Sequence, residues 1–363
     1  MAPAAAADAP PAGTGAPGPA APLEPEAPVV GEKAPTETYV ADPALPSSGV
    51  GTATGLGAGA DVQILPARDA GTPGSAAGGP EVNPLAGDTF YGPNGEAAAA
   101  AARLQASDPA GAALLAELAG VPSATWLGAW SGDVASAVRQ RVEAARAAGA
   151  VPVFVAYNAP GRDCGGHSAG GVSSPAAYAA WVQGIADGIG SAEAVVIVEP
   201  DTLALLCGDP AERYRMLASA VDVLEGNSGT RTYLDAGHSN WIGPQEMSQR
   251  LRAAGVDRAD GFALNVSNFE TTADNVAYGN ALSTELGGAR FVVDTSRNGN
   301  GAGTDWCNPS GRAMGERPTS STGHPLVDAY LWVKTPGESD GTCNGGPQAG
   351  VFWPEYALAL ARG

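Results

Sequence analysis

The stretch that decides the fold is Val195-Val196-Ile197-Val198-Glu199-Pro200-Asp201-Thr202-Leu203. Four consecutive branched apolar residues leave no polar face, which is typical of a strand buried on both sides in a parallel sheet covered by helices. The run ends at two carboxylates, Glu199 and Asp201, whose burial costs free energy unless they have partners or a function. Ligands bind at this end of the strands in α/β sheets and barrels. The stretch therefore predicts a carboxylate active site on a β/α scaffold.

Short apolar runs alternate with helical segments over the rest of residues 83–363. Strands are predicted over residues 124–130, 151–157, 195–199, 231–234, 261–264, 290–293 and 327–333. Helices are predicted within residues 88–119 and over residues 133–149, 174–190, 209–225, 245–254, 272–286 and 354–361. Ser174-Pro175 and Asp209-Pro210 are typical helix starts, with a capping side chain before proline at the first helical position. About seven strands alternating with helices predict an α/β fold with parallel strands.

Residues 1–82 differ in composition from the rest of the chain. The first 80 residues hold 14 of the 30 prolines and a single aromatic residue, Tyr39. Such a segment buries too little apolar area to offset the entropy of ordering it. We therefore predict a Pro/Ala/Gly-rich disordered linker or tail over residues 1–82, followed by one domain over residues 83–363.

The formal net charge of −19 argues against nucleic acid and against anionic membrane surfaces as partners. A neutral polymer or a small neutral ligand fits this charge better. No stretch is long and apolar enough to span a membrane, and neither a basic segment nor an apolar segment of a signal peptide is visible at Met1. The three histidines lie far apart in the sequence and no C-x-x-C pair occurs, so neither a metal nor a cofactor is expected.

Four cysteines, Cys164, Cys207, Cys307 and Cys343, allow three disulfide pairings. Cys164 and Cys207 each lie just beyond one of two successive predicted strands, so they can meet at one edge. Cys307 and Cys343 flank another strand. These two pairings are favoured and predict an oxidising, extracellular location. The alternative is four buried thiols.

Polar residues end every predicted strand from the second onward. Examples are Asp235, Asn265, Asp294 and Lys334, beside the two carboxylates of the central stretch. The second strand opens into a glycine-rich loop over residues 158–171, which is typical of a mobile active-site segment. Because parallel strands end at one edge, these side chains predict a single ligand site there.

Five segments, in order, resemble glycoside hydrolase family 6, the inverting cellulases. They are Val155-Ala156-Tyr157-Asn158-Ala159-Pro160-Gly161-Arg162-Asp163-Cys164, Val198-Glu199-Pro200-Asp201, Asp235-Ala236-Gly237-His238, Asp294-Thr295-Ser296-Arg297-Asn298-Gly299 and Lys334-Thr335-Pro336-Gly337-Glu338-Ser339-Asp340-Gly341. The resemblance covers residues 83–363 and implies a distorted seven-stranded parallel β/α barrel. It leaves residues 1–80 without an explanation.

The resemblance implies three catalytic carboxylates. Asp201 is expected to be the general acid, with helix capping as the alternative. Asp163 is expected to raise the pKa of Asp201 and to position water, with a pair to Arg162 as the alternative. Asp340 matches the residue proposed as base, although a water chain can relay the proton instead. A partner for Lys334 or Arg297 is the alternative role for Asp340.

Sugar rings present apolar C–H faces that suit aromatic side chains. The residues expected to bind the glucan are Tyr157, Trp126, Asp235, His238, Trp241, Asn268, Trp332, Lys334 and Glu338. The alternatives are a barrel-core tyrosine, a structural strand-end role for Asp235, and surface salt bridges for Lys334 and Glu338. Ser168 is a further candidate for contact with water or substrate. The tryptophans expected only to pack are Trp130, Trp181, Trp306 and Trp353.

The expected activity is inverting hydrolysis of internal β-1,4-glucosidic bonds by a secreted monomeric endoglucanase. Short loops after Lys334 and between Cys164 and Ser174 leave an open cleft that admits a chain anywhere along its length. The alternatives are an exo-acting cellobiohydrolase, a non-catalytic glucan-binding barrel, and a barrel enzyme that binds phosphorylated sugars through Arg297. Retention of both Asp201 and Asp163 argues against the binding protein.

Overall fold

The computed structural model describes residues 82–363, so the predicted linker over residues 1–82 lies outside the described residues apart from Val82. All seven predicted strands are present within this part of the chain. They are β2 (Thr125–Leu127), β3 (Val151–Ala156), β4 (Ala194–Val198), β5 (Thr230–Asp235), β6 (Gly261–Leu264), β7 (Arg290–Asp294) and β8 (Val327–Leu331). A two-residue strand, β1 (Phe90–Tyr91), was not predicted because it is too short to show a pattern.

Every strand pair is parallel, and β3 to β8 are hydrogen-bonded in the order of the chain. β1 and β2 both pair with the free edge of β3, with Phe90 opposite Val151 and Thr125 opposite Phe154. The sheet curls until β2 approaches the end of β8. Only two hydrogen bonds join them here: Ala124 N–H donates to Trp332 O (2.9 Å) and the Trp126 indole donates to Val333 O (2.8 Å). The predicted distorted parallel barrel is confirmed.

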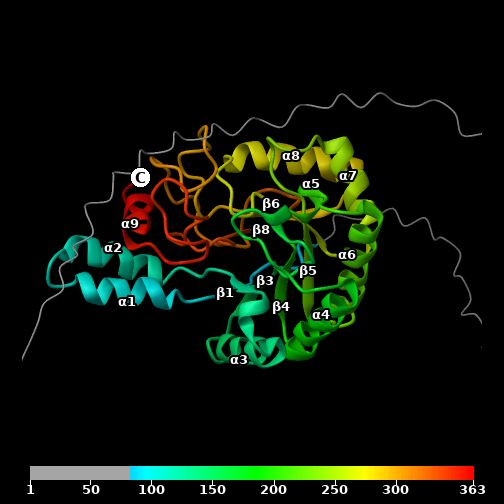
Figure 1. Ribbon diagram of the computed structural model, residues 1–363, viewed down its shortest axis with the longest axis horizontal. Coiled ribbons are helices and arrows are strands. Elements are labelled where there is room, and N and C mark those ends of the chain that lie inside the picture. Colours follow the sequence, from blue (N-terminus) through cyan, green and yellow to red (C-terminus); the bar gives the residue numbers. More distant parts are fainter. Residues whose placement is uncertain (1–81) are drawn as a thin grey trace, which may run out of the picture. The chain divides into compact units, whose positions relative to one another are not determined.

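Nine α-helices connect or flank the strands within the described residues. They are α1 (Gly95–Leu104), α2 (Pro109–Ala119), α3 (Val134–Ala147), α4 (Pro175–Ile189), α5 (Thr202–Leu205), α6 (Pro210–Leu224), α7 (Pro244–Ala253), α8 (Thr272–Glu285) and α9 (Pro354–Arg362). The predicted caps are present, since the side chains of Ser174 and Asp209 each accept a backbone N–H of their helix. α1, α2 and α9 gather beside one another, away from α4 and α6 (Figure 1). None of the helices within residues 82–363 is long and apolar enough to cross a lipid bilayer.

The central strand β4 is buried on both faces, as its unbroken apolar run predicts. Val195 and Ile197 point into the barrel with Tyr233. Val196 and Val198 point outward into the layer of helices. Because side chains alternate along a strand, the same residues build the barrel interior and the outer core. The rigid strand then delivers Glu199 and Asp201 to its carboxyl end.

Candidate active site

A cleft of about 1200 Å³ lies at the carboxyl ends of the strands. Ten of the twelve predicted catalytic and sugar-binding residues line it. They are Tyr157, Asp163, Asp201, Asp340, Trp126, His238, Trp241, Asn268, Lys334 and Glu338. Ser168 from the glycine-rich loop also lines the cleft. Asp235 and Trp332 are the two that do not. Topology alone brings these residues together, because seven parallel strands all end at one edge.

Asp201 lies at the cleft in the left-handed backbone region, with φ of 67°, directly before the short helix α5. Its side chain makes no capping hydrogen bond to that helix, so the capping alternative is not supported. Burial of the carboxyl, together with the negative charges of Asp163 and Asp340, raises the pKa of Asp201 to about 7. This carboxyl therefore keeps a proton at a pH where an ordinary aspartate has lost it.

Asp235 is buried behind Asp201 rather than exposed to a ligand, which corrects its predicted role in sugar binding. One carboxylate oxygen of Asp235 accepts the backbone N–H of Asp201 (2.9 Å) and that of Gly237 (3.1 Å). The structural alternative therefore holds for this residue. A hydrogen-bonded carboxylate at a strand end can bind neighbouring backbone instead of substrate, and the sequence does not distinguish the two.

Glu199, Asn265 and Asp294 are also buried and do not line the cleft, which corrects the prediction that all of the polar strand ends face one ligand site. Glu199 accepts the N–H groups of Asn158 (2.8 Å) and Ala159 (3.1 Å), and burial raises the pKa of Glu199 to about 7. Asp294 accepts four backbone N–H groups, from Ser267, Ser296, Val333 and Lys334. Through these hydrogen bonds, the two carboxylates join the loop after their own strand to the loops after neighbouring strands. Their only sequence signal is a carboxylate that directly follows a buried strand.

Asp163 is held by the glycine-rich loop that carries it. It also has a left-handed backbone, with φ of 56°, and its carboxylate accepts the N–H of Ser168 (2.7 Å). Arg162 turns its donors to three backbone carbonyls, those of Tyr157 (2.8 Å), Ser168 (2.6 Å) and Ala169 (3.1 Å). The alternative pairing of Arg162 with Asp163 is therefore not what the structure shows. Arg162 instead fixes the loop around Asp163.

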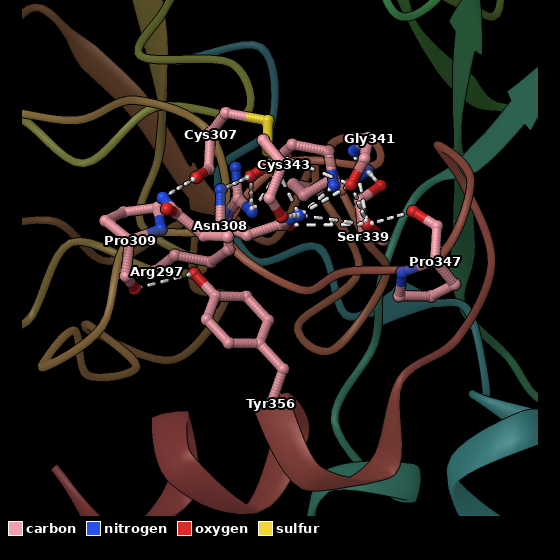
Figure 2. The surroundings of a disulfide bond; sticks show 12 residues. Arg297, Cys307, Asn308, Pro309, Ser339, Gly341, Cys343, Pro347 and Tyr356 are labelled. Carbon is pink, nitrogen blue, oxygen red and sulfur yellow. Dashed lines mark hydrogen bonds and ion pairs between the residues drawn. A yellow bond between two sulfur atoms is a disulfide. The ribbon is translucent and has the colours of Figure 1, made fainter. Parts of the chain in front are cut away.

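Asp340 lines the cleft and also forms a salt bridge with Arg297, at 2.9 Å. Arg297 is fully buried, and its guanidinium lies 4.2 Å from the centre of the Phe269 ring. Figure 2 shows how Asn308 joins the surrounding loops, since its side chain binds Ser339, Gly341 and Cys343. The Asn308 N–H also donates to the Asp340 carboxylate (3.0 Å). The predicted alternative, a partner for Arg297, therefore holds together with a position at the cleft.

Both favoured disulfides are confirmed. Cys164 is bonded to Cys207, with 5.5 Å between their Cα atoms, and Cys307 to Cys343, with 6.1 Å. The first disulfide joins the loop of Asp163 to the end of α5. The second joins the segment of Asn308 to the segment of Ser339 and Gly341 (Figure 2). Asp340 lies between Ser339 and Gly341 in the chain and accepts the Asn308 N–H. Both covalent links therefore hold active-site loops rather than the barrel core.

Aromatic rings lie along the cleft. Trp126 meets Tyr157 edge to face, with 5.1 Å between the ring centres. Trp241 is 37% exposed and lies 5.3 Å from the ring of His238. Lys334 lies 5.8 Å from the centre of the Trp126 ring and 3.7 Å from the Glu338 carboxylate, so the salt-bridge alternative for Lys334 and Glu338 holds at the cleft itself.

Trp332 is a core residue, which corrects its predicted role as a sugar platform. It is 3% exposed, and its indole donates to Glu316 O (2.9 Å). Leu331 and Val333 point into the barrel, so the alternation along the chain turns Trp332 outward. It packs there with Ala97 of α1 instead of facing a ligand.

Two tryptophans expected only to pack are exposed at the cleft instead. Trp130 is 58% exposed and Trp306 is 60% exposed, and both line it. Trp130 lies in the 3₁₀ turn Ala129–Ser131 and not in the predicted strand over residues 124–130, which ends at Leu127, and Trp306 lies in an irregular loop. No alternation along a strand therefore sets the direction of either side chain. Trp181 and Trp353 do pack, against Tyr178 and Tyr356 respectively. Within residues 82–363, no three His, Cys, Asp or Glu side chains group closely enough to hold a metal ion.

Comparison with known proteins identifies the family to which this cleft belongs. Residues 86–363 match the family described as glycosyl hydrolases family 6. The chain belongs to this family. Among solved structures of family members, the endoglucanase Cel6 of Mycobacterium tuberculosis, in complex with methyl-cellobiosyl-4-deoxy-4-thio-β-D-cellobioside, is 46% identical with a TM-score of 0.73. The match covers 77% of this chain and 99% of that one.

Curated relatives in glycosyl hydrolases family 6 include endoglucanases. Endoglucanase A of Cellulomonas fimi is 49% identical over 263 residues, which cover 71% of this chain and 58% of the relative. The chain thus spans less than two thirds of that protein. Endoglucanase 1 of Streptomyces halstedii is 45% identical over 76% of this chain and 88% of its own length. A probable 1,4-β-D-glucan cellobiohydrolase C of Aspergillus terreus is 31% identical over 61% of this chain and 59% of its own length.

Proposed function

We propose that the protein hydrolyses internal β-1,4-glucosidic bonds of cellulose or a related β-glucan, with inversion at the anomeric carbon. The observation that carries this proposal is the position of Asp201. It is a carboxyl at the cleft, beside Asp163 and Asp340, with a pKa raised to about 7. Such a group can donate its proton to the oxygen that links two glucose units.

Other side chains at the cleft are placed to activate water and to bind the glucan. An inverting enzyme needs a carboxylate that activates water on the opposite face of the sugar, with room for that water between the two carboxyl groups. We assign this work to Asp340, acting directly or through water held by Asp163. The salt bridge to Arg297 and the Asn308 N–H keep the Asp340 carboxylate in place. Tyr157, Trp126 and Trp241 offer ring faces to glucose, and the other polar residues at the cleft offer hydrogen bonds to its hydroxyls.

Endo action is supported by two lines of evidence. The relatives at 45% and 49% identity are named endoglucanases, whereas the cellobiohydrolase is 31% identical. The loops after Lys334 and between Cys164 and Ser174 are short. Two disulfides favour an oxidising, extracellular location, and a monomer remains our prediction for the oligomeric state.

Two measurements on carboxymethyl-cellulose and a cello-oligosaccharide test the proposal. The viscosity of the polymer is expected to fall well before reducing ends accumulate, because internal cuts shorten chains quickly. Proton NMR of the first products is expected to show the α-anomer. Steady cellobiose release with little loss of viscosity would indicate an exo-acting enzyme. A β-anomeric first product would contradict inversion, and glucan binding without hydrolysis would indicate a binding protein.

Replacing Asp163 with asparagine is expected to move the basic limb of the kcat–pH profile to lower pH. The negative charge of Asp163 helps to raise the pKa of Asp201, so its loss lowers that pKa. A general acid must carry its proton, so activity is lost as pH rises through this pKa. In the variant the loss begins at lower pH. Asp187→Asn, on the exposed face of α4, is the matched control and should leave the profile unchanged. An unmoved or raised basic limb in Asp163→Asn would contradict the assignment.

A further inference from the structure

Trp130 is one of two exposed tryptophans at the cleft, together with Trp306, that the proposed mechanism does not use. It lies in the short 3₁₀ turn Ala129–Ser131 that follows β2, four residues after Trp126. Its side chain is 58% exposed and lines the cleft. It shares the cleft with Trp126, Tyr157 and Trp241, and aromatic side chains gathered in one cleft are typical of a ligand-binding site.

Arg162 and Gly128 restrain the ring of Trp130. The guanidinium of Arg162 lies 5.1 Å from the centre of the Trp130 ring and 4.6 Å from that of Tyr157. Arg162 is itself 8% exposed and is held by three backbone carbonyls. Gly128 backs the ring, since a Cβ at that position would come within 2.4 Å of it. A cation beside the ring and close backbone on another side restrain its orientation.

A ring that is held in place before binding loses little side-chain entropy when a ligand covers it. Glucose units of a β-1,4-glucan present flat C–H faces that bury apolar area against such a ring. Arg162 connects Trp130 to Tyr157, so a glucan chain that covers Tyr157 passes close to Trp130. The ring therefore lies within reach of the chain that the cleft is proposed to bind.

We propose that Trp130 is a further glucose-binding platform of the cleft, on the side formed by the turn after β2 and the glycine-rich loop. This inference rests on the proposed function. The platform contributes to binding of the glucan chain and takes no part in proton transfer. Arg162 is its positioning residue, because it fixes both the ring and the loop that carries Asp163.

Kinetics of Trp130→Ala and Trp130→Phe on cellohexaose test the proposal. Trp130→Ala is expected to raise KM about tenfold, with kcat and its pH profile unchanged. Trp130→Phe, which keeps a smaller ring, should raise KM less. Isothermal titration of cellohexaose to Asp201→Asn, with and without Trp130→Ala, gives the affinity without hydrolysis and should show the same loss. The melting temperatures of the variants check that the fold is intact.

An unchanged KM and unchanged affinity in Trp130→Ala would overturn the proposal. So would a fall in kcat or a shift of the pH profile, because Trp130 would then act by bracing Arg162 and the loop of Asp163. Hydrolysis of carboxymethyl-cellulose by the unmodified protein is measured alongside. Its absence would count against the proposed function, whereas normal hydrolysis with no effect of Trp130→Ala counts only against the platform.

Discussion

Asp201→Asn is expected to lower kcat on carboxymethyl-cellulose by about 10²–10⁴-fold, the usual contribution of a general acid. Asparagine keeps the size of the side chain, but its amide N–H is not acidic enough to transfer a proton to the leaving oxygen. A dinitrophenyl cello-oligosaccharide needs little protonation, because its leaving group departs as a stable anion. The same variant should therefore lose far less activity on that substrate. Steady-state kinetics on the two substrates measures the difference.

The matched control for this experiment is Asp187→Asn, a carboxylate on the exposed face of α4, which should match the unmodified enzyme on both substrates. An equal loss on both substrates in Asp201→Asn would show that this carboxyl does not act as the acid. Retained activity on carboxymethyl-cellulose would exclude it from the reaction altogether. In either case the raised pKa of Asp201 would have no role in proton donation.

Arg297→Met is expected to lower the free energy of unfolding by about 3–5 kcal/mol, the usual effect of removing one partner from a buried ion pair. Arg297 is fully buried and the Asp340 carboxylate is almost so, so the variant leaves a buried charge without its cation. Activity on glucan should fall as well, because the carboxylate that we assign to water activation loses its position. Urea unfolding followed by tryptophan fluorescence gives the free energy, and kcat on carboxymethyl-cellulose gives the activity.

Arg317→Met is the control, because Arg317 and Glu117 form an ion pair in which both side chains are more than half exposed. Its loss should cost no more than about 1 kcal/mol. Adding Asp340→Asn to Arg297→Met removes the unpaired charge, so part of the stability should return while activity stays low. A small stability change in Arg297→Met, similar to that of Arg317→Met, would contradict the role of the buried pair.

The fold was predictable because strands such as β4 are apolar on both faces and end at recognisable polar residues. Because parallel strands end at one edge of the sheet, the position of the cleft and most of its lining residues were also predictable. The orientation of individual carboxylates was not predictable. Asp201 and Asp235 both follow buried strands, yet one faces the cleft and the other binds the backbone that positions it.

The orientation of the tryptophan side chains was also not predictable. The side on which Trp332 lies follows from the alternation of β8 once the boundary of the strand is known, and the strand ends one residue before it. Trp130 and Trp306 lie in segments without a repeating pattern, and tertiary contacts decide their exposure. Arg162 and Gly128, which hold Trp130, are distant from each other in sequence, so no local signal marks the ring as accessible.

The two hydrogen bonds between the β2 and β8 segments also have a mechanical consequence. Separating β3 from β4 would break a ladder of four residue pairs, whereas parting the barrel here breaks one backbone bond and one indole bond. We therefore expect local opening of the barrel to occur along this line more often than between β3 and β4. Trp126 lies on the β2 side of this line and Lys334 on the β8 side, and both line the cleft. Each opening would therefore change the width of the cleft between these two side chains.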